Sequence, residues 1–136
     1  MNGIVLDTNV VSETVRPEPD ANVMAFLSSE PNLWLSAIVV HELEYGIELL
    51  APGRRRDAIA SAVRQLVSEV RRIVPVGAAE AEHAAELRAQ ARRAGRTLEL
   101  SDALIAATAG VRRLALATRN VSDFEGLDLR LINPWE

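Results

Sequence analysis

The stretch Gly3-Ile4-Val5-Leu6-Asp7-Thr8-Asn9 joins a short apolar run directly to an acid and two small polar residues. A continuous apolar run of this length is typical of a strand that is buried on both faces of a parallel sheet. Asp7 would then lie at the carboxyl end of the strand, the edge where ligands bind in open α/β sheets. The alternative is that Asp7 only caps the next turn, with Thr8 and Asn9 as turn residues.

The rest of the chain alternates between extended and helical patterns. Further strands are predicted at 33–36, 72–76, 114–118 and 129–132. Helices are predicted at 20–29, 38–50, 54–71, 78–94 and from Ser101 onward, with a turn or short helix within 10–19. This alternation predicts one α/β domain over residues 1–136, with a mostly parallel sheet of four to five strands flanked by helices. Pro75 indicates that strand 72–76 is peripheral, and His83 is interpreted as a surface or packing residue.

The predicted helix 38–50 carries one acid beside its apolar stripe. The stripe consists of Val39, Leu43, Ile47 and Leu50, spaced at helical intervals. Glu42 lies at the edge of this stripe, and Gly46 lies one turn further on, where it would leave space beside the carboxylate. Glu42 and Glu44 are separated by about 200° around a helix of about 3.6 residues per turn, so they cannot serve one site. Glu44 and Glu48 are predicted to form a solvated face.

Composition excludes several classes of chemistry. The chain has no cysteine, so disulfides, cysteine-ligated zinc and a cysteine nucleophile are excluded. All 15 basic residues are arginines, so there is no lysine for a Walker-type phosphate site or a Schiff base. The net charge of -4 indicates that the whole chain is not a general polyanion binder. No apolar run reaches transmembrane length, so we expect a cytoplasmic protein that does not associate with membranes.

Four acids lie at the edges of predicted elements. Asp7 ends a strand, Glu42 and Asp102 lie on helices that follow a strand or loop, and Asp123 follows the strand 114–118. If the strands ending in Asp7 and Thr118 are neighbours, the four carboxylates converge above one sheet edge. A simpler reading of Asp102 is favourable placement in the first turn of a helix that Ser101 caps. Clustered carboxylates repel one another unless a cation lies among them, and hard oxygen ligands favour Mg²⁺ or Mn²⁺.

These segments resemble the four signatures of the PIN domain, and most closely those of VapC/FitB-type bacterial toxins. The resemblance rests on Ile4-Val5-Leu6-Asp7-Thr8-Asn9, on Glu42-Leu43 with Gly46, on 102–109, and on Thr118-Arg119-Asn120 with Asp123-Phe124. It spans nearly the whole chain, with the signatures in the right order. It implies a PIN-like fold and a metal-dependent endoribonuclease that cuts structured RNA such as tRNA.

The resemblance also assigns roles to residues and implies partners. Asp7, Glu42 and Asp102 would be the principal acids that place Mg²⁺ or Mn²⁺, and Asp123 would hold a second metal or orient water. The supporting residues would be Asn9, Thr118 and Asn120. The family implies a homodimer and a cognate antitoxin that holds the toxin inactive.

Two other functions fit parts of the pattern. A PIN scaffold could bind RNA or a protein without cutting, but such a protein has no chemical reason to keep all four acids. A phosphatase with an aspartyl nucleophile would also begin with an acid at the end of its first strand. That class needs a second aspartate two residues later, where this chain has Asn9, and a lysine, which this chain lacks.

Overall fold

The computed structural model describes residues 3–70 and 72–136, in which helices alternate with the strands of one sheet. The strands are β1 (Ile4–Leu6), β2 (Leu33–Ser36), β3 (Arg72–Val74), β4 (Ala115–Ala117) and β5 (Leu131–Ile132). The helices are α1 (Thr8–Glu13), α2 (Ala21–Ser29), α3 (Ala37–Glu48), α4 (Arg54–Glu69), α5 (Ala78–Arg93), α6 (Leu100–Gly110) and the short 3₁₀ helix η1 (Val121–Phe124).

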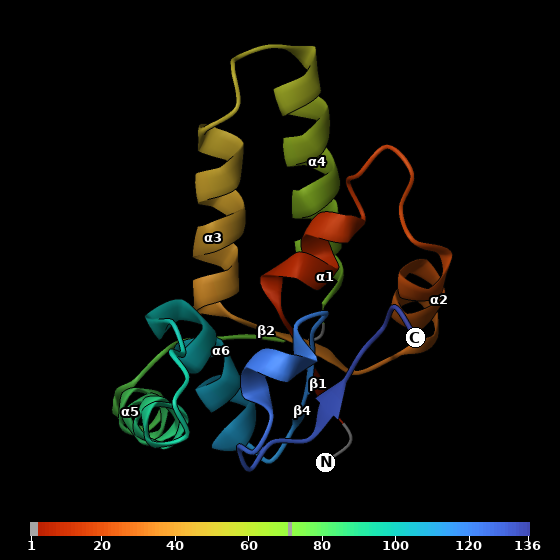
Figure 1. Cartoon of the computed structure of the whole chain (residues 1–136). Coiled ribbons are helices and arrows are strands. Elements are labelled where there is room, and N and C mark those ends of the chain that lie inside the picture. Colours follow the sequence, from red (N-terminus) through yellow and green to blue (C-terminus); the bar gives the residue numbers. More distant parts are fainter. Residues whose placement is uncertain (1–2, 71) are drawn as a thin grey trace.

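The sheet has the strand order β3-β2-β1-β4-β5, and every neighbouring pair is parallel. The chain first builds outward from β1 to β2 and β3, and later adds β4 and β5 on the other side of β1 (Figure 1). The direction of building therefore reverses beside β1, which creates a crevice above the carboxyl ends of the strands. The predicted α/β class and parallel sheet are confirmed, and β3 lies at an edge as Pro75 indicated.

The centre of the sheet is apolar because helices cover it on both faces. Every residue of β1, β2 and β4 is buried. Val5 of β1 pairs in register with Trp34 of β2 and with Leu116 of β4. Fully buried strands read as continuous apolar runs rather than as alternating patterns, which explains why these strands can be identified from sequence.

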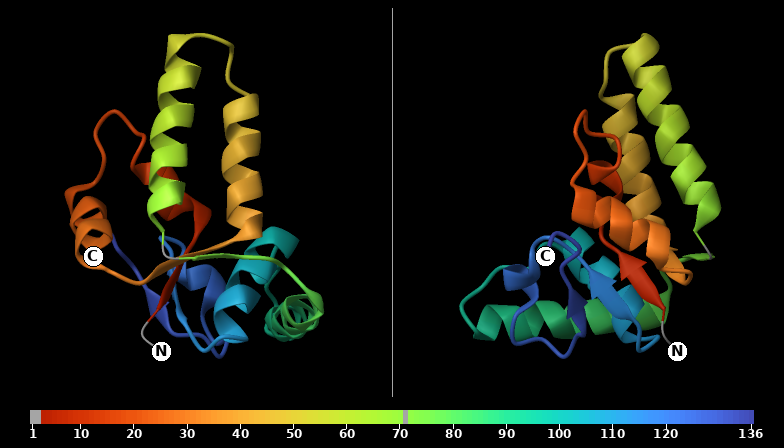
Figure 2. Two further views of the ribbon diagram at one scale, coloured as in Figure 1. Left: turned by 180° about the vertical axis from the view of Figure 1, so that it is seen from behind. Right: turned by 90° about the vertical axis from the view of Figure 1, so that its right-hand side faces the viewer.

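Helices α3 and α4 form a hairpin that projects beyond the carboxyl ends of the strands, whereas α5 and α6 pack against each other beside the sheet (Figures 1 and 2). The first turn of α6 lies at the same carboxyl ends. The apolar stripe of α3 is buried at Val39, Leu43 and Ile47. The predicted fourth member, Leu50, lies beyond the helix, which ends at Glu48. The helix predicted over 54–71 ends at Glu69 in the structure, and position 71 lies outside the described residues.

The face of α3 that was predicted to be solvated carries ion pairs to α4. Glu44 binds Arg64 with its two oxygens at 3.0 and 2.9 Å, and Glu48 binds Arg56 at 2.9 Å. Glu44, Arg64 and Glu48 are exposed and Arg56 is partly exposed, so solvent screens both pairs and they add little to stability. Glu44 thus points toward α4 and not toward the site of Glu42, as the helical spacing predicts.

Two details of α5 and α6 differ from or extend the sequence prediction. Helix α6 is capped by Glu99 and begins at Leu100, so the predicted cap at Ser101 is wrong by two residues. Glu99 is extended and its side chain makes no capping hydrogen bond, so the helix begins without the kind of cap that a sequence pattern reveals. His83 is a packing residue of α5, because a Cβ added at Gly110 of α6 would lie only 2.5 Å from its Nε2.

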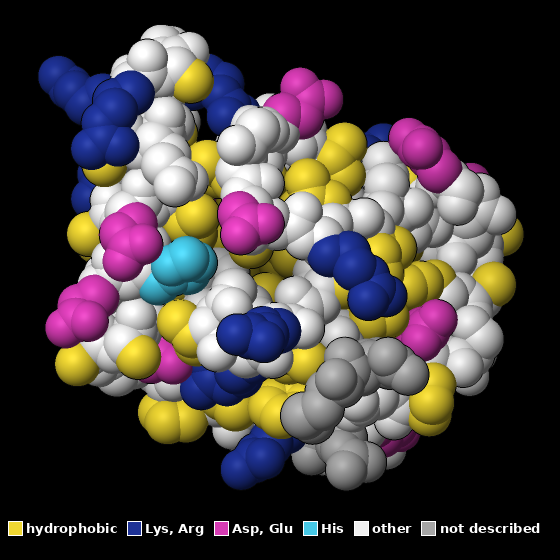
Figure 3. All heavy atoms as spheres, turned by 90° about the horizontal axis from the view of Figure 1, so that it is seen from below, with side chains coloured by type: hydrophobic (Ala, Val, Ile, Leu, Met, Phe, Trp, Pro, Cys, Tyr) yellow, Lys and Arg dark blue, Asp and Glu magenta, His cyan; other side chains and the backbone are white. Residues whose placement is uncertain are grey.

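Acidic and basic side chains are interspersed on the face at the amino ends of the strands (Figure 3). That face therefore presents no broad surface of one sign for a polyanion. Within residues 3–70 and 72–136, no helix combines the length and the apolar character that crossing a bilayer requires.

Replacing Leu116 by alanine tests the role of β4 in the core. Leu116 is fully buried beside β1, so Leu116→Ala is expected to lower the free energy of unfolding by about 2–5 kcal/mol. Leu49→Ala serves as the control, because Leu49 is 69% exposed, and its effect should stay within about 0.5 kcal/mol. Urea unfolding measures both, and equal effects would contradict the placement of β4.

Candidate active site

Asp7 lies at the carboxyl end of β1. Its side chain has both predicted features, since it caps the next turn and lies at the edge of the sheet where ligands bind. It is the N-cap of α1, and its Oδ1 accepts a hydrogen bond from the backbone N of Thr8 at 2.7 Å. Its Oδ2 accepts from the hydroxyl of Thr118 at 2.7 Å, across the ends of β1 and β4. Burial raises the pKa of Asp7, and these two hydrogen bonds lower it. The capping role and the position at the ligand-binding edge are therefore compatible.

Of the three residues predicted to support the site, Thr118 and Asn9 bind Asp7 directly, and Asn120 binds Thr118. Thr118 is fully buried, and besides donating to Asp7 it accepts from the backbone N of Asn120 at 3.1 Å. Asn9 donates its Nδ2 to Oδ2 of Asp7 at 3.4 Å and accepts from the backbone N of Arg119 at 3.3 Å. The chain that follows β4 is thus tied to the chain that follows β1.

Glu42 is held at the same pocket from α3. Its Oε1 accepts a hydrogen bond from Oγ1 of Thr8 at 2.6 Å, so Thr8 links the start of α1 to the acid. Gly46 borders a second hollow of about 520 Å³ beside Glu42, and a Cβ at Gly46 would meet no atom within 4 Å. The space that Gly46 was predicted to leave is therefore present.

Asp102 lies in the first turn of α6 and faces the same pocket. Burial, together with the charges of Asp7, Glu42, Asp123 and Glu99 in decreasing order, raises its pKa to about 6. A carboxyl whose pKa is raised by burial together with like charges is common at functional sites. Its first-turn position also satisfies the simpler helix-dipole reading.

Asp123 differs from the other three acids in its exposure. It lies in η1, is exposed, and is not among the residues that line the pocket. Its charge still raises the pKa of both Asp7 and Asp102. Arg96 holds this segment by donating to the backbone carbonyls of Ser122, Asp123 and Glu125. The predicted convergence of four acids is thus seen as three in the pocket wall and a fourth at its margin.

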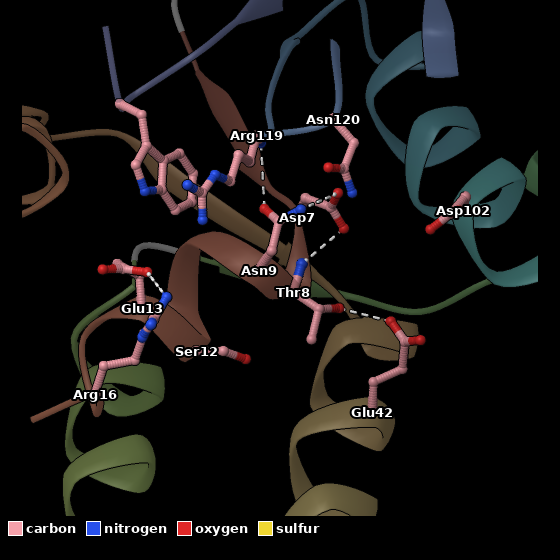
Figure 4. Close-up of a pocket in the computed structure, with 11 residues that line it drawn as sticks. Asp7, Thr8, Asn9, Ser12, Glu13, Arg16, Glu42, Asp102, Arg119 and Asn120 are labelled. Carbon is pink, nitrogen blue, oxygen red and sulfur yellow. Dashed lines mark hydrogen bonds and ion pairs between the residues drawn. The ribbon is translucent and has the colours of Figure 1, made fainter. Parts of the chain in front are cut away.

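The pocket has a volume of about 430 Å³ and opens above the carboxyl ends of β1 and β4. Figure 4 shows Asp102 and Glu42 on one side of Asp7, and Arg119, Glu13 and Arg16 on the other. The lining residues are Asp7, Thr8, Asn9, Ser12, Glu13, Arg16, Glu42, Asp102, Arg119, Asn120 and Trp135. The side with Arg16, Arg119 and Trp135 was not predicted, because no local sequence pattern places the end of the chain beside α1.

The donor set of the pocket fits a hard divalent cation such as Mg²⁺ or Mn²⁺. Within residues 3–70 and 72–136, no three acidic or histidine side chains close around a single point as a complete metal cage. Mg²⁺ characteristically keeps several waters and uses only one or two protein carboxylates, so a complete cage is not required. Asp7 is fixed in place and could still bind an ion, since a carboxylate retains acceptor capacity after three hydrogen bonds.

Replacing Thr118 by valine tests the hydrogen bond that Asp7 receives from β4. Thr118→Val keeps the shape of the side chain but leaves the buried Oδ2 without its closest donor. The free energy of unfolding in EDTA at neutral pH is expected to fall by about 1–3 kcal/mol. Thr118→Ser retains the hydroxyl and should lose less. Equal losses in the two variants would show that the hydroxyl does not stabilise Asp7.

Asp102 predicts an unusual pH dependence for the metal-free protein. Its pKa is about 6 in the folded chain against an ordinary 3.8, so the folded state binds the proton more tightly than the unfolded state does. Stability should therefore rise as the pH is lowered from about 7 to about 5 in EDTA. Asp102→Asn, which cannot titrate, should weaken this rise. Thermal unfolding across this pH range measures it, and identical profiles for both proteins would contradict the prediction.

Known proteins resemble this chain in sequence and in fold. The PIN domain family matches residues 4–128. A relative called VapC ribonuclease Y4jK, from Sinorhizobium fredii, is 39% identical over 98% of both chains. Toxin FitB from Neisseria gonorrhoeae is 37% identical over 97% of this chain and 98% of its own. The crystal structure of FitAcB from the same organism has a TM-score of 0.89 at 36% identity, covering 98% of this chain and 99% of that one. The protein therefore belongs to the PIN domain family, among relatives that include VapC and FitB toxins.

Proposed function

We propose that this protein is a metal-dependent endoribonuclease and the toxin of a toxin–antitoxin pair. The observation that carries the proposal is the pocket at the reversal point of the sheet, where Asp7, Glu42 and Asp102 are held by different elements. Names of full-length relatives support both parts, since one is called a ribonuclease and another a toxin. The substrate class we propose is structured RNA such as tRNA.

Each acid has a distinct part in the proposed reaction. A bound Mg²⁺ or Mn²⁺ would polarise the phosphodiester and activate water for in-line attack. Asp7, fixed by Thr118 and Thr8, would be the central ligand, and Glu42 and Asp102 would face it across the pocket. Asp123 would act from the margin, by orienting water or holding a second ion. The supporting roles belong to Asn9, Thr118 and Asn120, which fix the segments that carry these acids.

The cation would also solve an electrostatic problem of the pocket. Asp102 has neighbours of its own sign, and an RNA phosphate would add further negative charge. A divalent ion among the acids favours their ionised forms and attracts the phosphate, so one ion serves both needs. This is how an acidic chain with a net charge of -4 could act on a polyanion.

We further propose a cognate antitoxin as protein partner, a homodimer as assembly and the cytoplasm as location. The antitoxin proposal draws support from the similarity to FitB as it is seen in the FitAcB structure. The homodimer and the location rest on the resemblance to the family. The second candidate function, a PIN scaffold that binds RNA or protein without cutting, differs from the first in one measurable respect, which is cleavage.

Replacing Asp7 by asparagine tests the proposed chemistry. Asp7→Asn keeps the size of the side chain but removes the charge that would hold the ion, so cleavage should fall at least about a hundredfold. Purified protein is incubated with total RNA in Mg²⁺, in Mn²⁺ and in EDTA, and the fragments are resolved and their ends sequenced. Discrete fragments are expected only with metal and the unchanged chain.

Glu48→Gln is the matched control, because Glu48 is an exposed acid of α3 that pairs with Arg56 away from the pocket. It should cut RNA at the rate of the unchanged chain. Cleavage by Asp7→Asn at that same rate would remove Asp7 from the site. A folded, antitoxin-free protein that cuts no RNA under any of these conditions would favour the binding scaffold.

A further inference from the structure

Arg119 lies at the pocket with its side chain stacked on an aromatic ring. It directly follows Thr118 and lines the pocket together with Trp135. Its guanidinium carbon lies 5.1 Å from the centre of the Trp135 ring, and its backbone N donates to Asn9. The side chain is exposed, so its N–H groups are accessible from solvent. A backbone hydrogen bond to Asn9 therefore fixes the main chain of Arg119, and the Trp135 ring supports its guanidinium group.

The segment that carries Trp135 is itself held in place. The Nδ2 of Asn22 on α2 donates to the carbonyl of Trp135 at 2.9 Å, and the backbone N of Trp135 donates to Oδ1 of Asn133 at 3.0 Å. Pro134 is buried between them. The ring therefore supports Arg119 before any ligand arrives, which reduces the conformational entropy that the arginine loses on binding.

The charges around the pocket distinguish Arg119 from the other arginine that lines it. Arg16 pairs with Glu13 at 3.4 Å, so its charge is partly compensated. Arg119 has no carboxylate partner among the residues that the structure describes. It is thus a cation without a counterion, placed at the rim of a pocket whose other charged groups are mostly acids.

We propose that Arg119, supported by Trp135, binds an RNA backbone phosphate next to the one that is cut. This rests on the proposed nuclease function and adds a substrate-binding residue to it. The planar guanidinium presents paired donors that match two phosphate oxygens, and stacking on the ring leaves those donors free. Figure 4 shows Arg119 on the side of Asp7 away from Asp102 and Glu42, so a strand crossing the pocket would meet both sides.

A purely structural role for the pair makes a different prediction. If Arg119 only ties the chain end to the domain, its loss should lower thermal stability and leave RNA affinity unchanged. If it binds phosphate, its loss should lower RNA affinity and the salt dependence of binding, with little change in the melting temperature. The two readings are separated by measuring both quantities in one set of variants.

The experiment measures binding of a labelled pool of unfractionated transfer RNA by fluorescence anisotropy at several salt concentrations. Binding is measured without cleavage in two backgrounds, Asp7→Asn and the unchanged chain in EDTA. Arg119→Ala is expected to weaken binding about tenfold in both, because a hydrogen-bonded charge is lost. The slope of log affinity against log salt should also decrease in magnitude by about 1, since one phosphate contact is removed.

Two variants make the comparison specific. Arg130→Ala removes an equal charge from an exposed position just before β5, at the opposite end of the strands from the acids, and should leave affinity and slope unchanged. Arg119→Lys keeps the charge but not the paired donors, so it should retain the salt slope while binding more weakly than the parent.

The outcomes separate this inference from the nuclease proposal. Unchanged affinity in Arg119→Ala, or an equal loss in Arg130→Ala, would overturn the phosphate site even where the unchanged chain cuts RNA. A selective loss in Arg119→Ala would support it even where no cleavage is detected, and the absence of cleavage would then count against the nuclease alone. A parent that binds no RNA in either background would overturn the phosphate site, whereas the nuclease proposal would still be decided by the cleavage experiment with metal.

Discussion

The hydrogen bond between Thr118 and Asp7 joins the ends of two neighbouring strands, and the arrangement of the pocket depends on it. A buried carboxylate is unfavourable unless hydrogen bonds or charges compensate it, and Oδ2 of Asp7 obtains its shortest bond from a residue 111 positions away. That bond requires β1 and β4 to be parallel neighbours in the observed register, with Leu6 opposite Ala117. The fold and the candidate site therefore depend on the same strand register, because a shifted register would leave the carboxylate of Asp7 without its donor.

The same burial supports the proposal that the pocket binds a cation. Burial raises the pKa of Asp7, and burial with neighbouring acids raises that of Asp102 to about 6. The metal-free protein thus bears a cost for ionising these groups that a bound divalent ion would remove. The proposed cation would lie among acids that separate elements hold, since Asp7 follows β1, Glu42 lies on α3 and Asp102 lies on α6.

The sequence predicts a residue's role well when that role follows from the helix or strand that contains the residue. It predicts the role poorly when the role depends on contacts with residues far away in the chain. Asp7 could be placed because an apolar run precedes it. The cap of α6 was misplaced by two residues because Glu99 makes no side-chain capping hydrogen bond that a sequence pattern would reveal. The contact of Thr8 with Glu42 spans 34 positions, and Arg119 meets Trp135 only because the chain end folds back over α2. No local pattern encodes these pairs, so they emerge only from the tertiary structure.

In helix α3, the helical spacing places one acid at the candidate site and another on the face that packs beside α4. Glu42 and Glu44 are two positions apart, yet one faces the pocket through Thr8 and the other pairs with Arg64 of α4. At about 100° per residue, two positions place side chains on nearly opposite sides of a helix. A shift of one residue in α3 would turn Glu42 away from Asp7 and bury a charge elsewhere. The buried stripe at Val39, Leu43 and Ile47 opposes that shift, so core packing fixes the orientation of an acid that contributes little to the core.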